Sequence, residues 1–359
     1  MSRIFFITPD INSAAGGIKQ LYRQVDILNK NGFETLILHK EKGFRCSWFK
    51  NDTKVAYHFQ RIQDIENFLK KGSEKRSFIK TIISFRNLTA IFFKLDRLKN
   101  RYKFKEVIFE KEDVIVFPEI YAKAIDEIFL ENKKVIYNQN CYYTFRGCDY
   151  IEESSPYLNE NIKAIIVASE DAINYANYGF SSIPLYRVKY GIDEKVFAYS
   201  EGKKKQIAFM PRKLNEDVVQ VINLLNFRKI LNGWTFKIID KMDEHQVANA
   251  LKESAFFLSF NHREGFGMPP AEAMACGCVV VGYAGNGGKE FFKNDFSYPI
   301  EDRDVVSFAK TLEKVILEYE QDKKIFIEKG KKASEFILTE YSMEMEEKTI
   351  VESWNSILS

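Results

Sequence analysis

Short apolar runs alternate with amphipathic stretches along most of this chain. An amphipathic helix is expected near the start, because Leu21, Val25 and Leu28 recur at helical spacing. Buried strands of the first half are expected at Ile4–Ile7, Thr35–Leu38, Asp113–Phe117, Val135–Tyr137 and Ala164–Ala168. Strands that alternate with helices favour a parallel sheet, whose ligands bind at the carboxyl ends of the strands.

A second alternating pattern begins after Gly202, with a helix expected over Val218–Leu225 and a last helix over Ser342–Leu358. Its strands are expected at Gln206–Met210, Phe236–Ile239, Phe256–Phe260 and Val279–Val281. At 359 residues the chain exceeds one typical core, so two domains are expected. Hydrophobic residues at 45% and charged residues at 29% exclude extended disorder. The fold class predicted is α/β, with two Rossmann-like domains.

Composition also narrows the compartment and the chemistry. No run of about 18 apolar residues exists to span a bilayer, and the opening MSRIFFITPD is typical of a first strand rather than a secretory leader. The five cysteines are odd in number and lack zinc spacing, which favours reduced thiols in a cytoplasm. Four scattered histidines argue against a metal site.

The segment of residues 261–290 carries the most chemical information. It places Glu264 and Glu272 eight positions apart around a Gly-Phe-Gly turn, and Pro269-Pro270 then suits a helix start. Gly277 is placed to end that helix, before a valine strand and the glycine-rich loop of residues 285–288. Such an arrangement offers amide donors and helix dipoles to an anion such as a diphosphate. The alternative is that the two acids only complement a helix dipole.

The order of carboxylate, Gly-Phe-Gly, Pro-Pro, second carboxylate, Ala-Met-Ala, Gly and valine strand closely resembles the signature of retaining GT-B glycosyltransferases, family 4 and its relatives. The resemblance implies that Glu264 faces the hydroxyls of the donor sugar and that Glu272 binds the donor ribose. The turn implied to bind the donor comprises Gly265, Phe266, Gly267 and Met268. The segment Lys189–Asp193 with Phe197 resembles the family's linker, although Tyr190 replaces its asparagine.

The resemblance also implies a domain plan of two Rossmann-like domains facing across a cleft. Residues 1–198 would form the acceptor-binding domain, and residues 199–340 the nucleotide-sugar-binding domain. Residues 341–359 would form a helix that crosses back to the first domain.

A GT-B enzyme neutralises the leaving diphosphate with basic residues and helix N-termini, without a metal. Arg212 matches the family's arginine after the first strand of the second domain. The lysine usual five positions later is absent, because Asp217 stands there, and Lys213 is the best replacement. A pair of solvated cations is the alternative. Asp302-Arg303-Asp304 spells the DxD motif of metal-dependent enzymes, but its place just before a helix favours capping.

Other candidates lie in the first half. In the family, the position of Gly16-Gly17 matches a loop near the donor phosphate and the acceptor. Asn138, Gln139 and Asn140 follow a strand and are candidate acceptor contacts, because amides bind hydroxyls without titrating. Glu119 ends a neighbouring strand and is also predicted to point at the cleft. An ordinary polar turn is the alternative for all four.

The basic residues are concentrated in one stretch. Residues 68–111 hold thirteen Lys or Arg against four Asp or Glu, while the whole chain has a net charge of only +3. Apolar residues at helical spacing lie among these cations, a pattern typical of a segment on an anionic membrane. A helix packed on its own domain with solvated lysines is the equal alternative.

The sequence therefore predicts a metal-independent, retaining glycosyltransferase in the cytoplasm, with peripheral contact at the inner membrane face left open. It would move a sugar from a nucleoside-diphosphate sugar to a hydroxyl of a glycan or lipid-linked acceptor, with no cofactor. A nucleic-acid role has no supporting motif. A nucleotide-sugar epimerase of the same fold is the first alternative. A silent sugar-binding protein is the second, favoured if Arg212 and Lys213 do not reach the phosphate.

Overall fold

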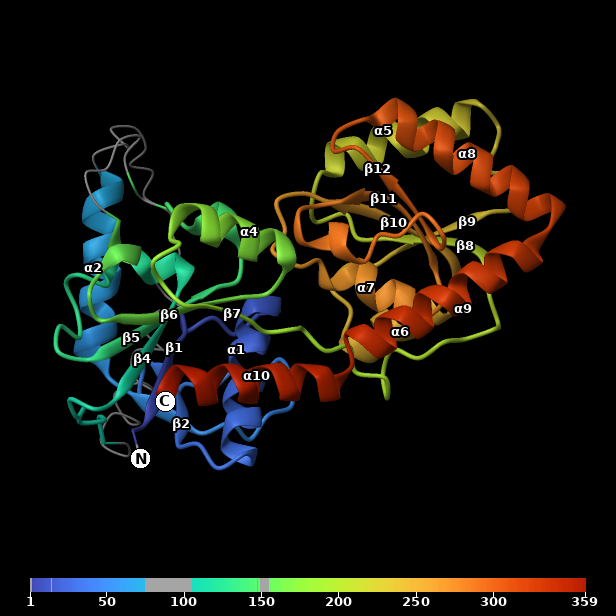
Figure 1. Ribbon diagram of the computed structural model, residues 1–359. Helices are drawn as coiled ribbons and strands as arrows, with labels where there is room; N and C mark the ends of the chain where they lie inside the picture. The colour runs from blue at the N-terminus through green and yellow to red at the C-terminus, as the bar shows by residue number, and fades with distance from the viewer. Residues whose placement is uncertain (1, 14, 75–104, 147, 149–154) are drawn as a thin grey trace, which may run out of the picture. The chain divides into compact units, whose positions relative to one another are not determined.

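The computed structural model describes residues 2–13, 15–74, 105–146, 148 and 155–359 (Figure 1). Contacts between residues divide the chain into two compact units. The first unit comprises residues 1–167, 175–186 and 350–359, and the second comprises residues 168–174 and 187–349. None of the described helices has the length and apolar character needed to cross a membrane.

The first unit is built on a seven-stranded sheet, and its strand pairs from β3 through β6 are parallel. The strands are β1 (Ile4–Ile7), β2 (Thr35–His39), β3 (Val55–Tyr57), β4 (Val114–Pro118), β5 (Lys133–Asn138), β6 (Ile162–Val167) and β7 (Leu185–Arg187). Their order in the sheet is β3-β2-β1-β4-β5-β6-β7. The order reverses between β1 and β4, and such a switch point is where open α/β sheets bind ligands.

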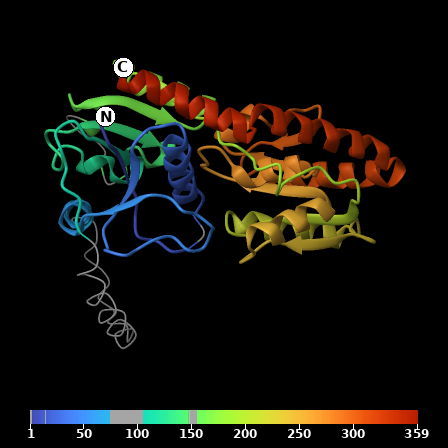
Figure 2. The ribbon, with the colours of Figure 1, turned by 90° about the horizontal axis from the view of Figure 1, so that it is seen from below.

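Helices of the first unit pack apolar stripes on this sheet. The elements are α1 (Gly16–Lys30), α2 (Phe59–Glu74), α4 (Glu170–Gly179), η1 (Glu119–Ala124), η2 (Cys141–Tyr143) and η3 (Pro156–Leu158). The predicted residues Leu21, Val25 and Leu28 of α1 are buried. The last helix, α10 (Met343–Leu358), groups with the second unit up to Thr349 and with the first unit from Ile350. Its end lies beside the first unit's strands, with the Trp354 ring 5.7 Å from that of Phe6 (Figures 1 and 2).

The second unit has a five-stranded parallel sheet in the order β12-β11-β10-β8-β9. The strands are β8 (Lys204–Phe209), β9 (Thr235–Ile238), β10 (Ser254–Asn261), β11 (Val279–Ala284) and β12 (Ser297–Ile300). The helices are α5 (Asn215–Phe227), α6 (Glu244–Glu253), α7 (Met268–Ala275), η4 (Gly287–Glu290), α8 (Val305–Gln321) and α9 (Lys323–Glu340). The sheet lies between α5 and α8 on one face and α6, α7 and α9 on the other (Figure 1). Here the switch point falls between β8 and β10.

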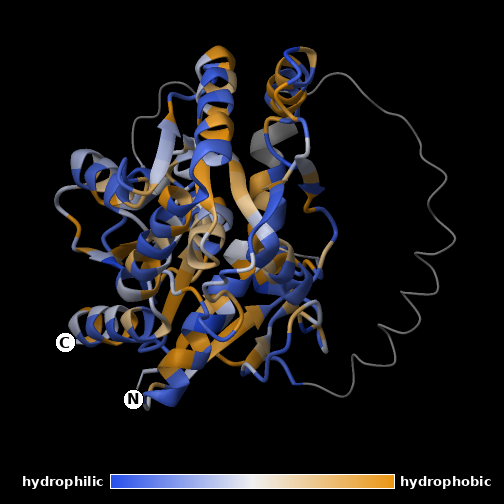
Figure 3. Cartoon of the chain, turned by 90° about the vertical axis from the view of Figure 1, so that its right-hand side faces the viewer, coloured by the Kyte–Doolittle hydropathy of each residue, from blue (hydrophilic) through white to orange (hydrophobic). Residues whose placement is uncertain are grey.

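Burial explains why the strands read as continuous apolar runs. Every residue of β10 and β11 is buried, as expected of parallel strands covered on both faces. The strands are largely hydrophobic, while the helices carry both hydrophobic and hydrophilic residues (Figure 3). Aromatic rings fill the second unit's core, where Trp234 stacks on Phe256 with ring centroids 5.1 Å apart.

Each strand predicted from the sequence is present and begins within two residues of the expected position. Three strands, β3, β7 and β12, were not predicted. Each has only three or four residues, and each contains residues that are not fully buried, so its apolar run is too short to stand out. Their pairing with longer neighbours makes them strands.

Candidate functional site

The switch point of the second unit brings together two of the predicted catalytic residues. Lys213 comes in the turn after β8, and Glu264 follows β10, the neighbouring strand. The Lys213 ammonium and the Glu264 carboxylate form an ion pair. The Lys213 side chain is 34% exposed and that of Glu264 is 21% exposed, so a ligand can reach both. A cation and an anion thus share the edge of the sheet where ligands bind.

The predicted donor-binding turn leads directly into α7. Gly267 precedes the helix with a φ of +99°, and a β-carbon there would come within 2.5 Å of the Asn261 side-chain nitrogen. Met268 opens α7 ahead of the two prolines, and the first turn contains no acidic residue. The positive end of this helix is therefore left for an anion other than one of its own side chains.

Phe266 contributes to the turn as a hydrophobic anchor. Its side chain is 3% exposed, and its ring lies 5.2 Å from those of Phe291 and Tyr341, centroid to centroid. The ring of Tyr190 is 5.6 Å away. Tyr190 is the residue that departs from the family's linker pattern, and the structure gives it this packing role. Any donor contact made by Phe266 must therefore come from its backbone.

The loop after β11 holds the Glu264 loop in place through the backbone. The Gly287 N–H donates to the Glu264 carbonyl oxygen at 3.2 Å. A β-carbon on Gly287 would lie 2.0 Å from the Gly265 carbonyl oxygen, so no larger residue fits. Sequence reasoning noted the glycine-rich loop but missed this contact, because it joins residues from loops that follow different strands.

Glu272 lies half-buried on α7, on the helix that the donor turn opens. That helix ends as predicted, because Gly277 takes a φ of +83°. Cys276 and Cys278 on either side of Gly277 are fully buried, and burial raises the pKa of the Cys278 thiol. The Cys278 thiol donates to the Leu251 carbonyl oxygen at 3.0 Å. Their interpretation as small packing residues is confirmed.

The departure at Asp217 has a structural explanation. Asp217 is buried in α5, where its carboxylate accepts hydrogen bonds from the Tyr283 hydroxyl at 3.0 Å and from Arg303 at 2.9 Å. The acid is therefore engaged within the fold at the position where the resemblance leads one to expect a lysine. Arg212 is exposed beside Lys213, in the same turn after β8.

The Asp302-Arg303-Asp304 sequence serves the start of α8, as predicted. Asp304 caps the helix by accepting the Ser307 N–H at 2.9 Å, and its hydrogen bonds with Ser307 lower the pKa of the Asp304 carboxyl. Asp302 lies 3.3 Å from His262, oxygen to ring nitrogen. Across the described ranges, no three His, Cys, Asp or Glu side chains are grouped to hold a metal ion.

The first unit gathers its candidates at its own switch point. Gly16 and Gly17 open α1 after β1, Glu119 follows β4, and Gln139 follows β5, the next strand in the sheet. The Glu119 carboxylate accepts the Gln139 backbone N–H at 3.1 Å. The Gln139 side-chain amide donates to the Gly17 carbonyl oxygen at 3.2 Å. Four candidate residues that are distant in sequence are thus close in space.

The other two amides organise the loop after β5. Asn138 is fully buried, and its side chain donates to the Thr144 hydroxyl at 2.7 Å and to the Tyr157 hydroxyl at 3.0 Å. Asn140 precedes η2 and accepts the Tyr142 N–H at 3.1 Å. Sequence reasoning missed Thr144 and Tyr157, because nothing in the pattern ties either to Asn138.

Glu119 is a buried carboxyl group. Burial raises the pKa of Glu119 to about 7, even though the Gln139 N–H and the Arg146 guanidinium act in the opposite direction. Both ionisation states are therefore populated near neutral pH.

The raised pKa predicts how stability changes with pH. The folded protein holds this proton more tightly than the unfolded chain, whose ordinary value is 4.5, so stability should fall as pH rises from about 4.5 to about 7. The contribution is about 3 kcal/mol by the usual conversion. Thermal melts of the wild type and Glu119→Gln at several pH values check this. The variant should gain relative stability across that window, and an equal slope for both proteins would contradict the prediction.

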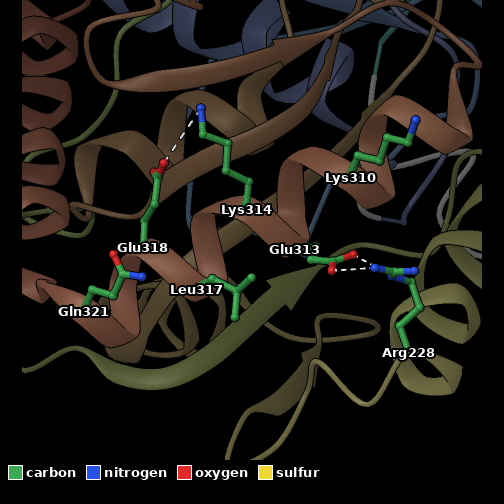
Figure 4. A pocket seen from close by; sticks show the side chains of 7 residues that line it. All are labelled: Arg228, Lys310, Glu313, Lys314, Leu317, Glu318 and Gln321. Atoms are coloured by element: carbon green, nitrogen blue, oxygen red, sulfur yellow. Dashed lines mark hydrogen bonds and ion pairs between the residues drawn. The ribbon is translucent and has the colours of Figure 1, made fainter.

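A surface hollow on α8 is not part of either site (Figure 4). Arg228 forms a two-pronged ion pair with Glu313, at 2.6 and 2.7 Å, and Lys314 lies 3.7 Å from Glu318. These charges neutralise one another on the outer side of a helix, away from the carboxyl ends of the strands.

Comparison with known sequences points to one enzyme class. Residues 227–333 match the family model "Glycosyl transferases group 1". An alpha-1,6-glucosyltransferase of Actinobacillus pleuropneumoniae serotype 7 (strain AP76) is 28% identical over 191 residues, which are 50% of this chain and 56% of the relative. The chain thus spans about half the length of this curated relative. The two matches support a hexosyltransferase.

Solved structures agree over the whole chain. Sucrose-phosphate synthase from Thermosynechococcus elongatus superposes with a TM-score of 0.65 at 12% identity, over 99% of both chains. TarM superposes with a TM-score of 0.63 at 13% identity, over 100% of this chain and 99% of its own. The chain has the GT-B fold. Another GT-B structure, Anabaena HepE in complex with UDP and glucose, gives 0.62 at 12% identity, over 99% of this chain and 100% of its own.

Proposed function

We propose that this protein is a metal-independent, retaining glycosyltransferase. It moves a hexose from a nucleoside-diphosphate sugar to a hydroxyl of a glycan or lipid-linked acceptor. The Lys213–Glu264 ion pair carries this proposal, because it lies at a switch point beside the turn that opens α7. HepE with UDP and glucose, and Staphylococcus aureus TarM with UDP and a sugar product, support a UDP-sugar as the donor.

Each proposed role follows from a charge or a donor at this edge. Lys213 and Arg212, with the N-terminus of α7, neutralise the diphosphate. Glu264 accepts hydrogen bonds from hydroxyls of the donor sugar, and Glu272 binds the ribose. The turn of residues 265–268 offers backbone amides, and Gly16-Gly17 at the start of α1 does the same toward the donor phosphate.

Retention requires attack from the face that the diphosphate leaves. The acceptor oxygen bonds to the anomeric carbon as the bond from that carbon to the phosphate oxygen breaks. The departing phosphate takes the proton of the acceptor hydroxyl, so no protein base is needed. Glu264 orients and polarises the sugar in this scheme and does not become bonded to it.

The test is a hydrolysis screen with UDP-glucose first, then other UDP-, GDP- and dTDP-sugars, in which proton NMR identifies the first anomer released. An α-anomer from an α-linked donor supports retention, and a β-anomer would overturn it. Free nucleotide with an altered sugar would indicate the epimerase, which the comparisons do not favour. Donor binding without turnover on any donor or acceptor would indicate the silent binding protein.

Activity is expected to persist in EDTA, because protein cations and helix ends supply the counter-charge. The measurement is the rate of UDP release from UDP-glucose with EDTA present and after readdition of magnesium or manganese. A strict requirement for either ion would return attention to Asp302-Arg303-Asp304.

The lipid-linked acceptor rests on the basic segment of residues 68–111, of which 75–104 lie outside the described residues. We expect the protein to sediment with anionic liposomes, more weakly at high salt, at about 1 kcal/mol per basic residue near the surface. Replacing Lys70, Lys71, Lys75 and Arg76 with glutamine should release it without loss of activity on a soluble acceptor. Equal recovery with anionic and neutral liposomes would identify these cations as a solvated face.

A further inference from the structure

Three loops of the first unit are joined by two hydrogen bonds in series. They follow β1, β4 and β5, which are neighbours in the sheet. The Glu119 carboxylate accepts the Gln139 N–H, and the Gln139 side chain reaches the carbonyl oxygen of Gly17. Gly17 belongs to the first turn of α1, whose N-terminal end is bonded by no capping side chain and contains no acid.

Burial decides what Glu119 can do. The residue is only 6% exposed, and its carboxylate is directed at the backbone of Gln139. Gln139 is itself half-buried, with its side chain extended to α1. Glu119 therefore acts on the switch point through Gln139 and not by touching a substrate.

We propose that Glu119 is a positioning residue, which holds Gln139 against Gly17 and so fixes the first turn of α1 in the orientation that presents its amides to a substrate phosphate. The inference rests on the proposed function for the phosphate, while the hydrogen-bonded series itself does not. A carboxylate accepts an N–H more strongly than a neutral acid does, so the ionised form holds Gln139 better.

The groups around Glu119 leave it free to titrate near neutral pH. Arg146, beyond η2, is the cation that lowers its pKa, and Tyr157 of η3 is the nearby phenol, whose own pKa is raised by burial. From α2 and the loop after β1, the charges of Glu66 and Asp10 act on Tyr121 of η1. Glu119, with a pKa of about 7, is the group whose ionisation should tighten or loosen this arrangement.

Two adjacent glycines provide a matched pair of variants. A β-carbon on Gly17 would lie 2.5 Å from the Gln139 side-chain oxygen and would displace that side chain. A β-carbon on Gly16 would meet nothing within 4 Å. Both residues open the same helix, so only the Gln139 contact distinguishes Gly17→Ala from Gly16→Ala.

The experiment follows Gln139 by NMR in full-length protein labelled with ¹⁵N-glutamine, with Gln139→Ala to assign its signals. In the wild type, the Gln139 backbone and side-chain signals should shift with a midpoint near pH 7. Glu119→Gln should abolish that titration. Gly17→Ala should move the side-chain signal, and Gly16→Ala should leave it in place. Glu119→Asp, which keeps the charge but shortens the reach, is the second variant if Glu119→Gln fails to fold.

A parallel measurement follows kcat/KM for UDP-glucose hydrolysis between pH 6 and 8. It should rise about fivefold with ionisation in the wild type and stay flat in Glu119→Gln, given the usual difference between charged and neutral hydrogen bonds. An unchanged Gln139 titration in Glu119→Gln, or none in the wild type, would overturn the positioning role. Absence of hydrolysis with the NMR titration intact would instead count against the proposed function alone.

Discussion

Glu264→Gln is expected to lower the turnover of UDP-glucose by tenfold or more while the fold survives. Glutamine keeps the size of the side chain and some hydrogen bonding, but it removes the negative charge that pairs with Lys213 and is proposed to polarise the donor sugar. Steady-state kcat and KM, with circular dichroism as the check of folding, measure the effect.

Two further variants show whether the effect belongs to this site. Glu272→Ala should mainly raise the KM for the donor, since its proposed partner is the ribose. Glu313→Gln removes an ion-paired glutamate from the surface of α8 and should leave both constants unchanged. Full activity in both Glu264→Gln and Glu272→Ala would mean that the site has been placed wrongly.

Gly287→Ala is expected to disable the same site through the backbone. The new β-carbon would lie 2.0 Å from the Gly265 carbonyl oxygen, so the loops after β10 and β11 must separate and carry Glu264 with them. We expect a loss of about 2 kcal/mol or more in the free energy of unfolding, and a fall in activity of at least tenfold. Thermal melting and UDP-glucose hydrolysis provide the two readouts.

The neighbouring glycine is the control for that variant. A β-carbon on Gly288 would meet its nearest atoms, in Phe291 and Phe292, at 3.5 Å, which is ordinary contact. Gly288→Ala should therefore retain stability and most activity. Equal losses in the two variants would show that the segment resists any side chain, and that the Gly265 contact is not the cause.

Much of the site was predictable because its residues are close in sequence. The turn of residues 265–268, the prolines that open α7 and the glycine that ends it are local features, and the structure has them where the pattern placed them. The capping role of Asp304 was predictable for the same reason, since its partner Ser307 lies in the next turn. The roles of these residues toward a donor, and the domain limits, remain predictions.

Long-range contacts were not predictable from the pattern. Asp217 was noted as a departure, but its bonds to Tyr283 and Arg303 depend on elements far along the chain. Asn138 was a candidate acceptor contact, whereas the structure directs its amide to Thr144 and Tyr157. Polar residues at strand ends look alike in sequence, and only the folded chain assigns their partners.

The sequence by itself determined the α/β class, the positions of the longer strands and the carboxylate-bearing turn that feeds α7. These follow from hydrophobic periodicity and from glycine and proline chemistry, which act over a few residues. Only the tertiary structure decided which strand ends adjoin each other, and hence that Lys213 meets Glu264 and that Gln139 joins Glu119 to Gly17. The physical reason is that strand order in a parallel sheet is set by crossovers and by burial on both faces, to which the whole chain contributes.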